Sequence, residues 1–131
     1  MAERRILVVD DEKMIHTVMK GALEKHGFRV HSAFDSVQAP MMARQVKPDL
    51  IVLDITMPGG GGYEAFKRFQ MMTTTAMVPI LVYTSVLPAE VAARIPESAS
   101  VGHLTKPAEP DAILAAIRRL LGDAPVGEAP V

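Results

Sequence analysis

Short apolar runs alternate with stretches of helical periodicity along most of the chain. Ile6–Val9 and Leu50–Leu53 are unbroken apolar runs, and such runs are typical of strands buried on both faces of a parallel sheet. Between them, apolar residues recur at intervals of three and four, as on one face of a helix. The pattern predicts strands over residues 6–9, 28–34, 50–53, 78–83 and 100–104, and helices over residues 15–26, 36–46, 63–72, 88–95 and 110–121.

Glycine, proline and serine mark the expected ends of these helices. Gly27 and Gly122 are expected to end the first and last helices, and Ser36 to cap the second, with Pro40 in its first turn. Strands that alternate with helices in this way indicate a doubly wound α/β sheet with helices on both faces. In such sheets, ligands bind beyond the carboxyl ends of the strands.

Polar residues follow four of the five predicted strands. Because the carboxyl ends of parallel strands meet at one edge of the sheet, we expect one cleft to contain several carboxylates, a hydroxyl group and an ammonium group. The residues are Asp10, Asp11 and Glu12 after the first strand, Asp54 after the third, Thr84 and Ser85 after the fourth, and Lys106 with Pro107 after the fifth.

Clustered carboxylates repel one another unless a cation joins them, and a set of oxygen ligands favours Mg²⁺. No histidine is adjacent to these acids in the sequence, which argues against zinc. A carboxylate beside Mg²⁺ can attack phosphorus, and Lys106 and Thr84 would then balance the charge of the phosphoryl oxygens. Each residue alone has an ordinary explanation as a helix cap or turn former, but the ordered set makes a chance arrangement improbable.

Composition narrows the class of protein further. The chain has 131 residues, a formal net charge of -1 and no cysteine. The slightly negative net charge argues against electrostatic binding to nucleic acid or to an anionic membrane. The absence of cysteine excludes disulfides and thiolate chemistry. No apolar run approaches the roughly 20 residues that span a bilayer. The basic start, residues 1–5, is followed by too short an apolar run for a signal peptide. We therefore expect a single cytoplasmic domain.

From about Arg4 to Leu121, the chain resembles the receiver domain of two-component response regulators of the chemotaxis type. The resemblance implies a flavodoxin-like (βα)5 fold with strand order 2-1-3-4-5 over residues 1–122, and a flexible tail or linker stub over residues 123–131. Its marks are Ile6–Glu12, Pro48–Pro58 with Gly62-Tyr63-Glu64, Thr84 and Lys106-Pro107.

The resemblance also assigns roles to the residues at the strand ends. Asp54 would be the phosphoacceptor and a direct Mg²⁺ ligand. Thr84 would be the switch hydroxyl, and Lys106 would pair with the phosphoryl group. The remaining ligands would be Asp11 directly, Asp10 through water and Thr56 through its backbone carbonyl.

The sequence departs from the family pattern at several positions. His103 stands where Tyr or Phe is usual, and it is either a switch residue or a histidine that fills a strand position. Ala108 replaces an aromatic residue, and Ser85 follows Thr84 where a smaller residue is common. The fourth helix is short, and glycines at positions 59–62 suggest a flexible loop. Outside the site, we expect the methionines to fill core gaps, with any exposed ones favouring partner binding, and His16, His26 and His31 to lie on the surface.

The sequence thus predicts a single-domain, phosphorylation-activated response regulator, a switch and not an enzyme, whose phosphoryl group comes from a histidine kinase or phosphotransfer protein. It would be a monomer or a phosphorylation-dependent dimer. It would bind a downstream protein, not nucleic acid, on the face of the fourth helix, fifth strand and fifth helix. Alternatives are the receiver part of a longer regulator with a DNA-binding or enzymatic output domain, an aspartyl-phosphate phosphohydrolase, a flavin binder, and a degenerate receiver that takes no phosphoryl group.

Overall fold

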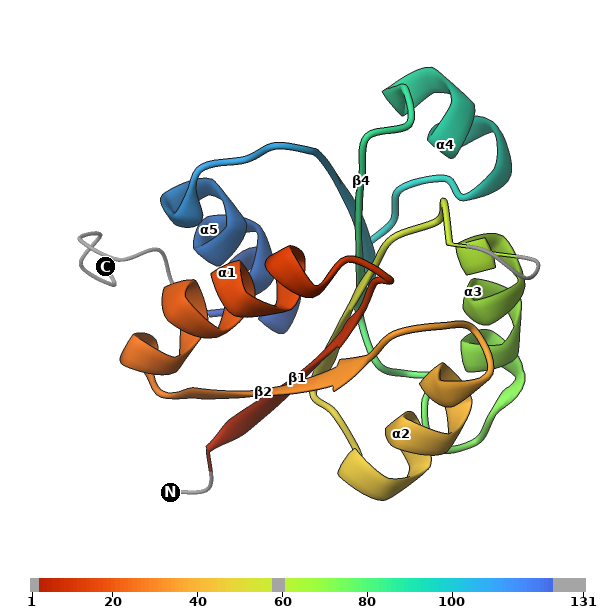
Figure 1. Ribbon diagram of the computed structural model, residues 1–131. Coiled ribbons are helices and arrows are strands. Elements are labelled where there is room, and N and C mark those ends of the chain that lie inside the picture. Colours follow the sequence, from red (N-terminus) through yellow and green to blue (C-terminus); the bar gives the residue numbers. More distant parts are fainter. Residues whose placement is uncertain (1–2, 58–60, 124–131) are drawn as a thin grey trace.

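A five-stranded parallel sheet forms the centre of the molecule (Figure 1), whose computed structural model describes residues 3–57 and 61–123. The strand order is β2-β1-β3-β4-β5, as predicted, and each pair of neighbours is parallel. The strands are β1 (Arg4–Val9), β2 (Phe28–Ala33), β3 (Leu50–Leu53), β4 (Ile80–Thr84) and β5 (Val101–Thr105).

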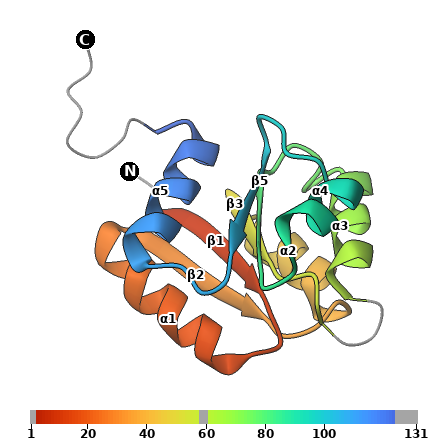
Figure 2. The ribbon, with the colours of Figure 1, turned by 90° about the horizontal axis from the view of Figure 1, so that it is seen from above.

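Helices cover both faces of this sheet. Figure 2 shows α1 and α5 on one side and α2, α3 and α4 on the other. The helices are α1 (Lys13–Leu23), the 3₁₀ turn η1 (Glu24–His26), α2 (Gln38–Val46), α3 (Gly61–Met71), α4 (Pro88–Arg94) and α5 (Pro110–Leu121). None of the helices in residues 3–57 and 61–123 combines the length and the apolar character that a transmembrane span requires.

Two apolar cores fill the space between the sheet and the helices. Leu7 and Val9 of β1 belong to the core under α2 and α3, whereas Ile6 and Val8 belong to the core under α1 and α5. All four side chains are fully buried, which explains why the strand has no polar alternation. The predicted doubly wound class is therefore confirmed.

The helix ends differ from the sequence prediction by a few residues. α1 begins at Lys13, and its last predicted turn is the separate 3₁₀ turn η1. α2 begins at Gln38 and not at the predicted cap, because the Asp35 carboxylate accepts the amides of Val37 and Gln38 at 2.9 and 2.7 Å. Such a bond from a carboxylate to the amides that follow it forms a turn ahead of the helix.

Two expectations about surface residues were wrong in part. His16 is only 5% exposed, because its ring packs at 4.3 Å against Phe34 and its Nε2 lies 2.7 Å from the Asp10 carbonyl oxygen. His26 is exposed, and His31 is half-buried. Of the methionines, Met19 and Met57 are core residues, whereas four others are exposed apolar side chains: Met14, Met41, Met71 and Met77.

The expected glycine loop is described only in part. Pro58, Gly59 and Gly60 lie outside the described residues, whereas Gly61 and Gly62 form the first turn of α3. Gly61 has a φ of +69°, a backbone conformation that favours glycine. A Cβ atom on Gly62 would collide with the carbonyl oxygen of Asp54 and with Cα of Ile55. Close packing on the backbone that directly follows β3, not flexibility, therefore explains Gly62.

Candidate functional site

The carboxyl ends of β1, β3, β4 and β5 bring four of the predicted residues to one edge of the sheet. Asp10 and Asp54 directly follow β1 and β3, Thr84 is the last residue of β4, and Lys106 directly follows β5. Asp10, Asp54 and Thr84 are each 2% exposed. Chain order alone would leave these residues far apart, so the parallel sheet is what assembles them.

The Lys106 ammonium group lies among three carboxylates. Its Nζ is 2.8 Å from Oδ2 of Asp10, 3.4 Å from Oδ2 of Asp54 and 3.6 Å from Oε1 of Glu12. The Lys106-Pro107 peptide bond is cis, and the Lys106 backbone N–H donates to the Thr84 carbonyl at 2.9 Å. Both the backbone and the side chain of Lys106 are therefore tied to the site.

Burial and the neighbouring charges act against each other at Asp10 and Lys106. Burial raises the pKa of Asp10 above 3.8, and the hydrogen bond from Lys106 offsets only part of that rise. At Lys106, burial alone would lower the pKa. The hydrogen bond to Asp10 and the charge of Asp54 outweigh it, so the pKa of Lys106 is raised above 10.5. The ammonium group is therefore charged at neutral pH.

Thr56, two residues after Asp54, also contacts the Asp54 carboxylate. Its hydroxyl Oγ1 lies 3.0 and 2.9 Å from the two carboxylate oxygens, and its backbone N–H donates to Oδ1 at 3.2 Å. The Asp54 backbone N–H in turn donates to the Val9 carbonyl at 3.0 Å. The resemblance gave Thr56 a metal-binding role through its backbone carbonyl and did not predict this hydroxyl contact. The signal for the contact is a hydroxyl residue two positions after the acid.

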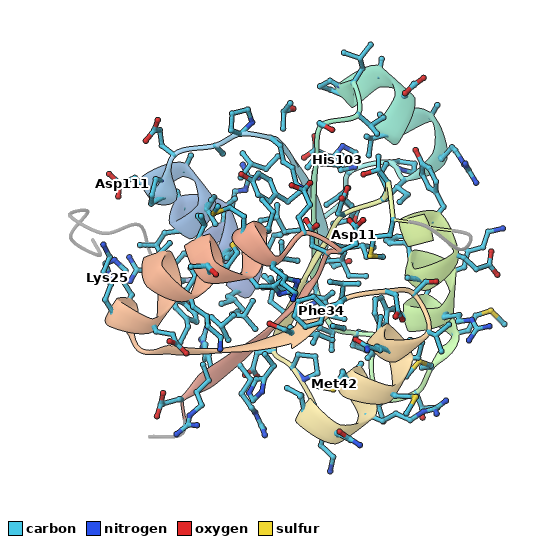
Figure 3. The ribbon with its side chains drawn as sticks, viewed as in Figure 1. Asp11, Lys25, Phe34, Met42, His103 and Asp111 are labelled. Carbon is cyan, nitrogen blue, oxygen red and sulfur yellow. The ribbon has the colours of Figure 1, made fainter. Side chains whose placement is uncertain are left out.

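The acidic group that could hold a cation consists of Asp10, Glu12 and Asp54, with one carboxylate oxygen from each lying within 4.8 Å of the others. Asp11, labelled in Figure 3 at the loop after β1, is exposed and is not part of this group. Its role as a direct ligand stays a prediction. Glu12, which directly follows Asp10 and Asp11 in the sequence, is a member of the group although the resemblance gave it no role.

This donor set fits a hard divalent cation. All of its donors are carboxylate oxygens, two of the three acids are buried, and no histidine or cysteine belongs to the group. Such ligands suit Mg²⁺ or Ca²⁺ and do not suit zinc.

Among the described residues, neither Thr84 nor His103 has a hydrogen bond or ion pair with Asp10, Glu12 or Asp54. The Thr84 hydroxyl accepts the Val86 backbone N–H at 3.4 Å. His103, labelled in Figure 3, is in β5 and has a largely buried side chain, whose Nδ1 lies 3.9 Å from the carboxylate of Glu97. The predicted switch roles of both residues stay predictions.

The fold is a doubly wound domain that carries a cluster of carboxylates and one ammonium group at the carboxyl edge of its sheet. Comparison of the sequence with known families matches residues 6–118 to the response regulator receiver domain. The chain belongs to this family, the receiver domains of two-component response regulators.

Individual relatives agree with this assignment. The chain is 31% identical over 117 residues to the Protein PilH of Pseudomonas aeruginosa, covering 89% of this chain and 97% of PilH. Chemotaxis protein CheY4 of Vibrio cholerae superposes with a TM-score of 0.84 at 28% identity, covering 91% of this chain and 99% of CheY4.

A third relative is the receiver domain of sensor histidine kinase PA1611 from Pseudomonas aeruginosa PAO1, whose structure holds a magnesium ion in the active site cleft. It has a TM-score of 0.81 at 25% identity and covers 93% of this chain and all of that domain. The chain spans about half the length, 48% to 52%, of several other curated relatives, which are transcriptional regulators.

Proposed function

We propose that this receiver domain accepts a phosphoryl group on Asp54 in the presence of Mg²⁺ and thereby switches the binding of a partner protein. The observation that carries the proposal is the buried Asp54 carboxylate with the Lys106 ammonium 3.4 Å away, beside a cluster of further acids. An anionic nucleophile beside a fixed cation is the arrangement that phosphoryl transfer needs, because charge spreads over the equatorial oxygens.

In the proposed reaction, an oxygen of the Asp54 carboxylate forms a bond to phosphorus while the bond to the donor's histidine nitrogen breaks. The Lys106 ammonium then pairs with an oxygen of the transferred group. The Thr56 hydroxyl lies against the Asp54 carboxylate and restricts the orientation of the attacking oxygen. Because the carboxylate is buried and held, little reorganisation is needed during the transfer.

Asp54, Asp11 and the Thr56 carbonyl would hold the Mg²⁺ ion directly and Asp10 would hold it through water; Glu12 lies close enough to contribute as well. When bound, the ion supplies positive charge that offsets the repulsion between the carboxylates and the phosphoryl oxygens. Support comes from the oxygen-only donor set and from the magnesium ion in the cleft of the related PA1611 domain.

The donor in this proposal is a histidine kinase or a histidine phosphotransfer protein, and the domain works in the cytoplasm. After transfer, Thr84 turns toward the phosphoryl group, and His103 follows it. The shift changes the face formed by α4, β5 and α5, where a downstream protein binds. A bias of a few kcal/mol is enough to move such a two-state equilibrium.

A second candidate is the receiver part of a longer regulator, and its support is the half-length match to transcriptional regulators. An aspartyl-phosphate phosphohydrolase is less well supported. Such an enzyme needs an acid or base two residues after its nucleophile, and that position holds Thr56, whose hydroxyl is engaged with Asp54.

The proposal is tested by the intact mass of the protein after incubation with acetyl phosphate. With Mg²⁺ present, the wild type is expected to gain one phosphoryl group, and Asp54→Asn to gain none. Asp111→Asn serves as a matched control, because it neutralises an exposed carboxylate in the first turn of α5. Equal gain by wild type and Asp54→Asn, or no gain by the wild type, would overturn the proposal.

A further inference from the structure

The loop that carries Lys106 is anchored to two consecutive residues of β4. The Lys106 backbone N–H donates to the Thr84 carbonyl at 2.9 Å, which continues the sheet pairing of β4 with β5. Two residues later, the Ala108 backbone N–H donates to the phenol oxygen of Tyr83 at 3.0 Å. Pro107, which lies between them, has no N–H to donate. The second anchor of this loop is therefore a side chain, that of Tyr83.

Tyr83 lies near both the backbone that follows Lys106 and the Lys106 ammonium group. It is 4% exposed and belongs to the core under α1 and α5, against which Ala108 also packs. Its hydroxyl reaches the backbone just after Lys106, and the centre of its ring lies 5.7 Å from the Lys106 ammonium nitrogen. A rigid, buried ring thus connects the interior of the domain to the residue that approaches Asp10 and Asp54.

We propose that Tyr83 is a positioning residue, which keeps the Lys106 ammonium at the carboxylates where the phosphoryl group forms. A lysine side chain has many rotamers, so its charge is effective only when the backbone that bears it is fixed. The phenol hydrogen bond fixes that backbone beyond the last strand pair. This inference rests on the proposed phosphoryl transfer to Asp54, because it concerns the cation that serves that reaction.

The first test is the rate of phosphorylation by acetyl phosphate in Tyr83→Phe, which removes one oxygen atom and keeps the ring. We expect the rate to fall roughly three- to tenfold, the range given by the loss of one neutral hydrogen bond. The affinity for Mg²⁺, measured by calorimetry, is expected to stay unchanged, because Tyr83 has no hydrogen bond to an acid of the cluster among the described residues. Tyr63→Phe is the matched control, since it removes the only other tyrosine hydroxyl in the chain.

A double-mutant cycle separates positioning from a general structural effect. In a Lys106→Ala background, Tyr83→Phe is expected to cause no further fall in rate, because the group that Tyr83 positions is already absent. An equal loss of rate in the two backgrounds would show that Tyr83 acts independently of Lys106 and would overturn the inference. A wild-type rate in Tyr83→Phe would also overturn the inference.

Hydrogen exchange gives a readout that does not need phosphorylation. In Tyr83→Phe, the amide of Ala108 is expected to exchange faster, while amides within β4 keep their protection. Unchanged exchange at Ala108 would contradict the inference even if phosphorylation were slow. Conversely, a wild type that gains no phosphoryl group would reject the proposed function, while exchange at Ala108 would still decide whether Tyr83 anchors the loop.

Discussion

At the scale of single residues, the buried carboxylate of Asp10 is the group whose ionisation opposes folding. Three carboxylates surround the one ammonium group of Lys106, so the cluster is net negative when all are ionised. Burial first, and then the nearby charge of Asp54, raise the pKa of Asp10 above its unfolded value of 3.8. The folded protein therefore holds this proton more tightly than the unfolded chain does.

The sign of the resulting pH dependence follows from linkage. The stability that protonated Asp10 contributes is fully present below pH 3.8 and is lost as the pH rises through the raised pKa of Asp10. Asp10→Asn is therefore expected to be more stable than wild type at pH 7, by about 1 kcal/mol, because Lys106 keeps Asp54 and Glu12 as partners. The advantage should shrink toward pH 4.

Urea denaturation at several pH values, with EDTA present to remove metal ions, measures this difference. Asp111→Asn, which changes an exposed carboxylate, should show no comparable gain at pH 7. A lower stability of Asp10→Asn than of wild type at pH 7 would show that the ion pair with Lys106 outweighs the cost of burying the Asp10 charge, which contradicts this prediction.

The positions of Asp10, Asp54, Thr84 and Lys106 could be predicted from the sequence, because each one ends or follows a recognisable strand. The contacts of Thr56, His16 and Tyr83 could not. They depend on which way a side chain points and on what an element distant in sequence places opposite it, and neither is encoded in apolar periodicity. His16 is the clearest example, because its partner is a backbone carbonyl, which every residue has.

At the scale of elements, the start of α3 is packed directly on the segment that carries Asp54. The Gly62 N–H donates to the Ile55 carbonyl at 3.2 Å, and the space for a side chain on Gly62 is filled by the backbone of residues 54 and 55. Because backbone atoms cannot move aside cheaply, the position of α3 and the position of Asp54 are coupled. A residue outside the carboxylate cluster thus determines its geometry.

Gly62→Ala is accordingly expected to destabilise the fold by about 1–3 kcal/mol through overpacking and to slow phosphorylation of Asp54. Gly21→Ala is the matched control. Gly21 is exposed within α1 and has nothing within 4 Å of an added Cβ, so alanine should stabilise the protein by about 0.5–1 kcal/mol. Urea denaturation of both variants measures the two effects. A neutral Gly62→Ala would show that α3 can shift without cost.

The strands were predictable from the sequence because both faces of the sheet are covered, which leaves unbroken apolar runs at β1 and β3. Helix ends were less predictable. The start of α2 is set by the Asp35 carboxylate, and the split of α1 from η1 is a local change of hydrogen bonding that apolar periodicity does not detect.

At the scale of the whole molecule, the carboxylate cluster and the Lys106 ammonium group come from the ends of β1, β3 and β5, so a cation bound there would act on the stability of the entire fold. Any ligand that binds the folded state alone stabilises it by mass action. At a Mg²⁺ concentration ten times its dissociation constant, the expected gain is about 1.4 kcal/mol. In the absence of metal, a single ammonium group offsets the repulsion among the several carboxylates of the cluster.

Chemical denaturation with and without MgCl₂ measures this gain, and NaCl at equal ionic strength controls for screening. Asp54→Asn is expected to lose most of the gain, because it removes one of the buried acids of the cluster. Equal stabilisation of the wild type and Asp54→Asn by Mg²⁺ would place the cation elsewhere on the protein.

The proposed function depends most directly on Asp54 being the residue that carries the phosphoryl group. Borohydride reduction after incubation with acetyl phosphate and Mg²⁺ converts an aspartyl phosphate to homoserine, and peptide mass mapping then locates it. Homoserine is expected at position 54, and no reduced side chain is expected at the other acids near Lys106. Homoserine at Asp10 or Asp11, hydroxynorvaline at Glu12, or no homoserine at position 54 in a protein that has gained the phosphoryl mass, would contradict this assignment.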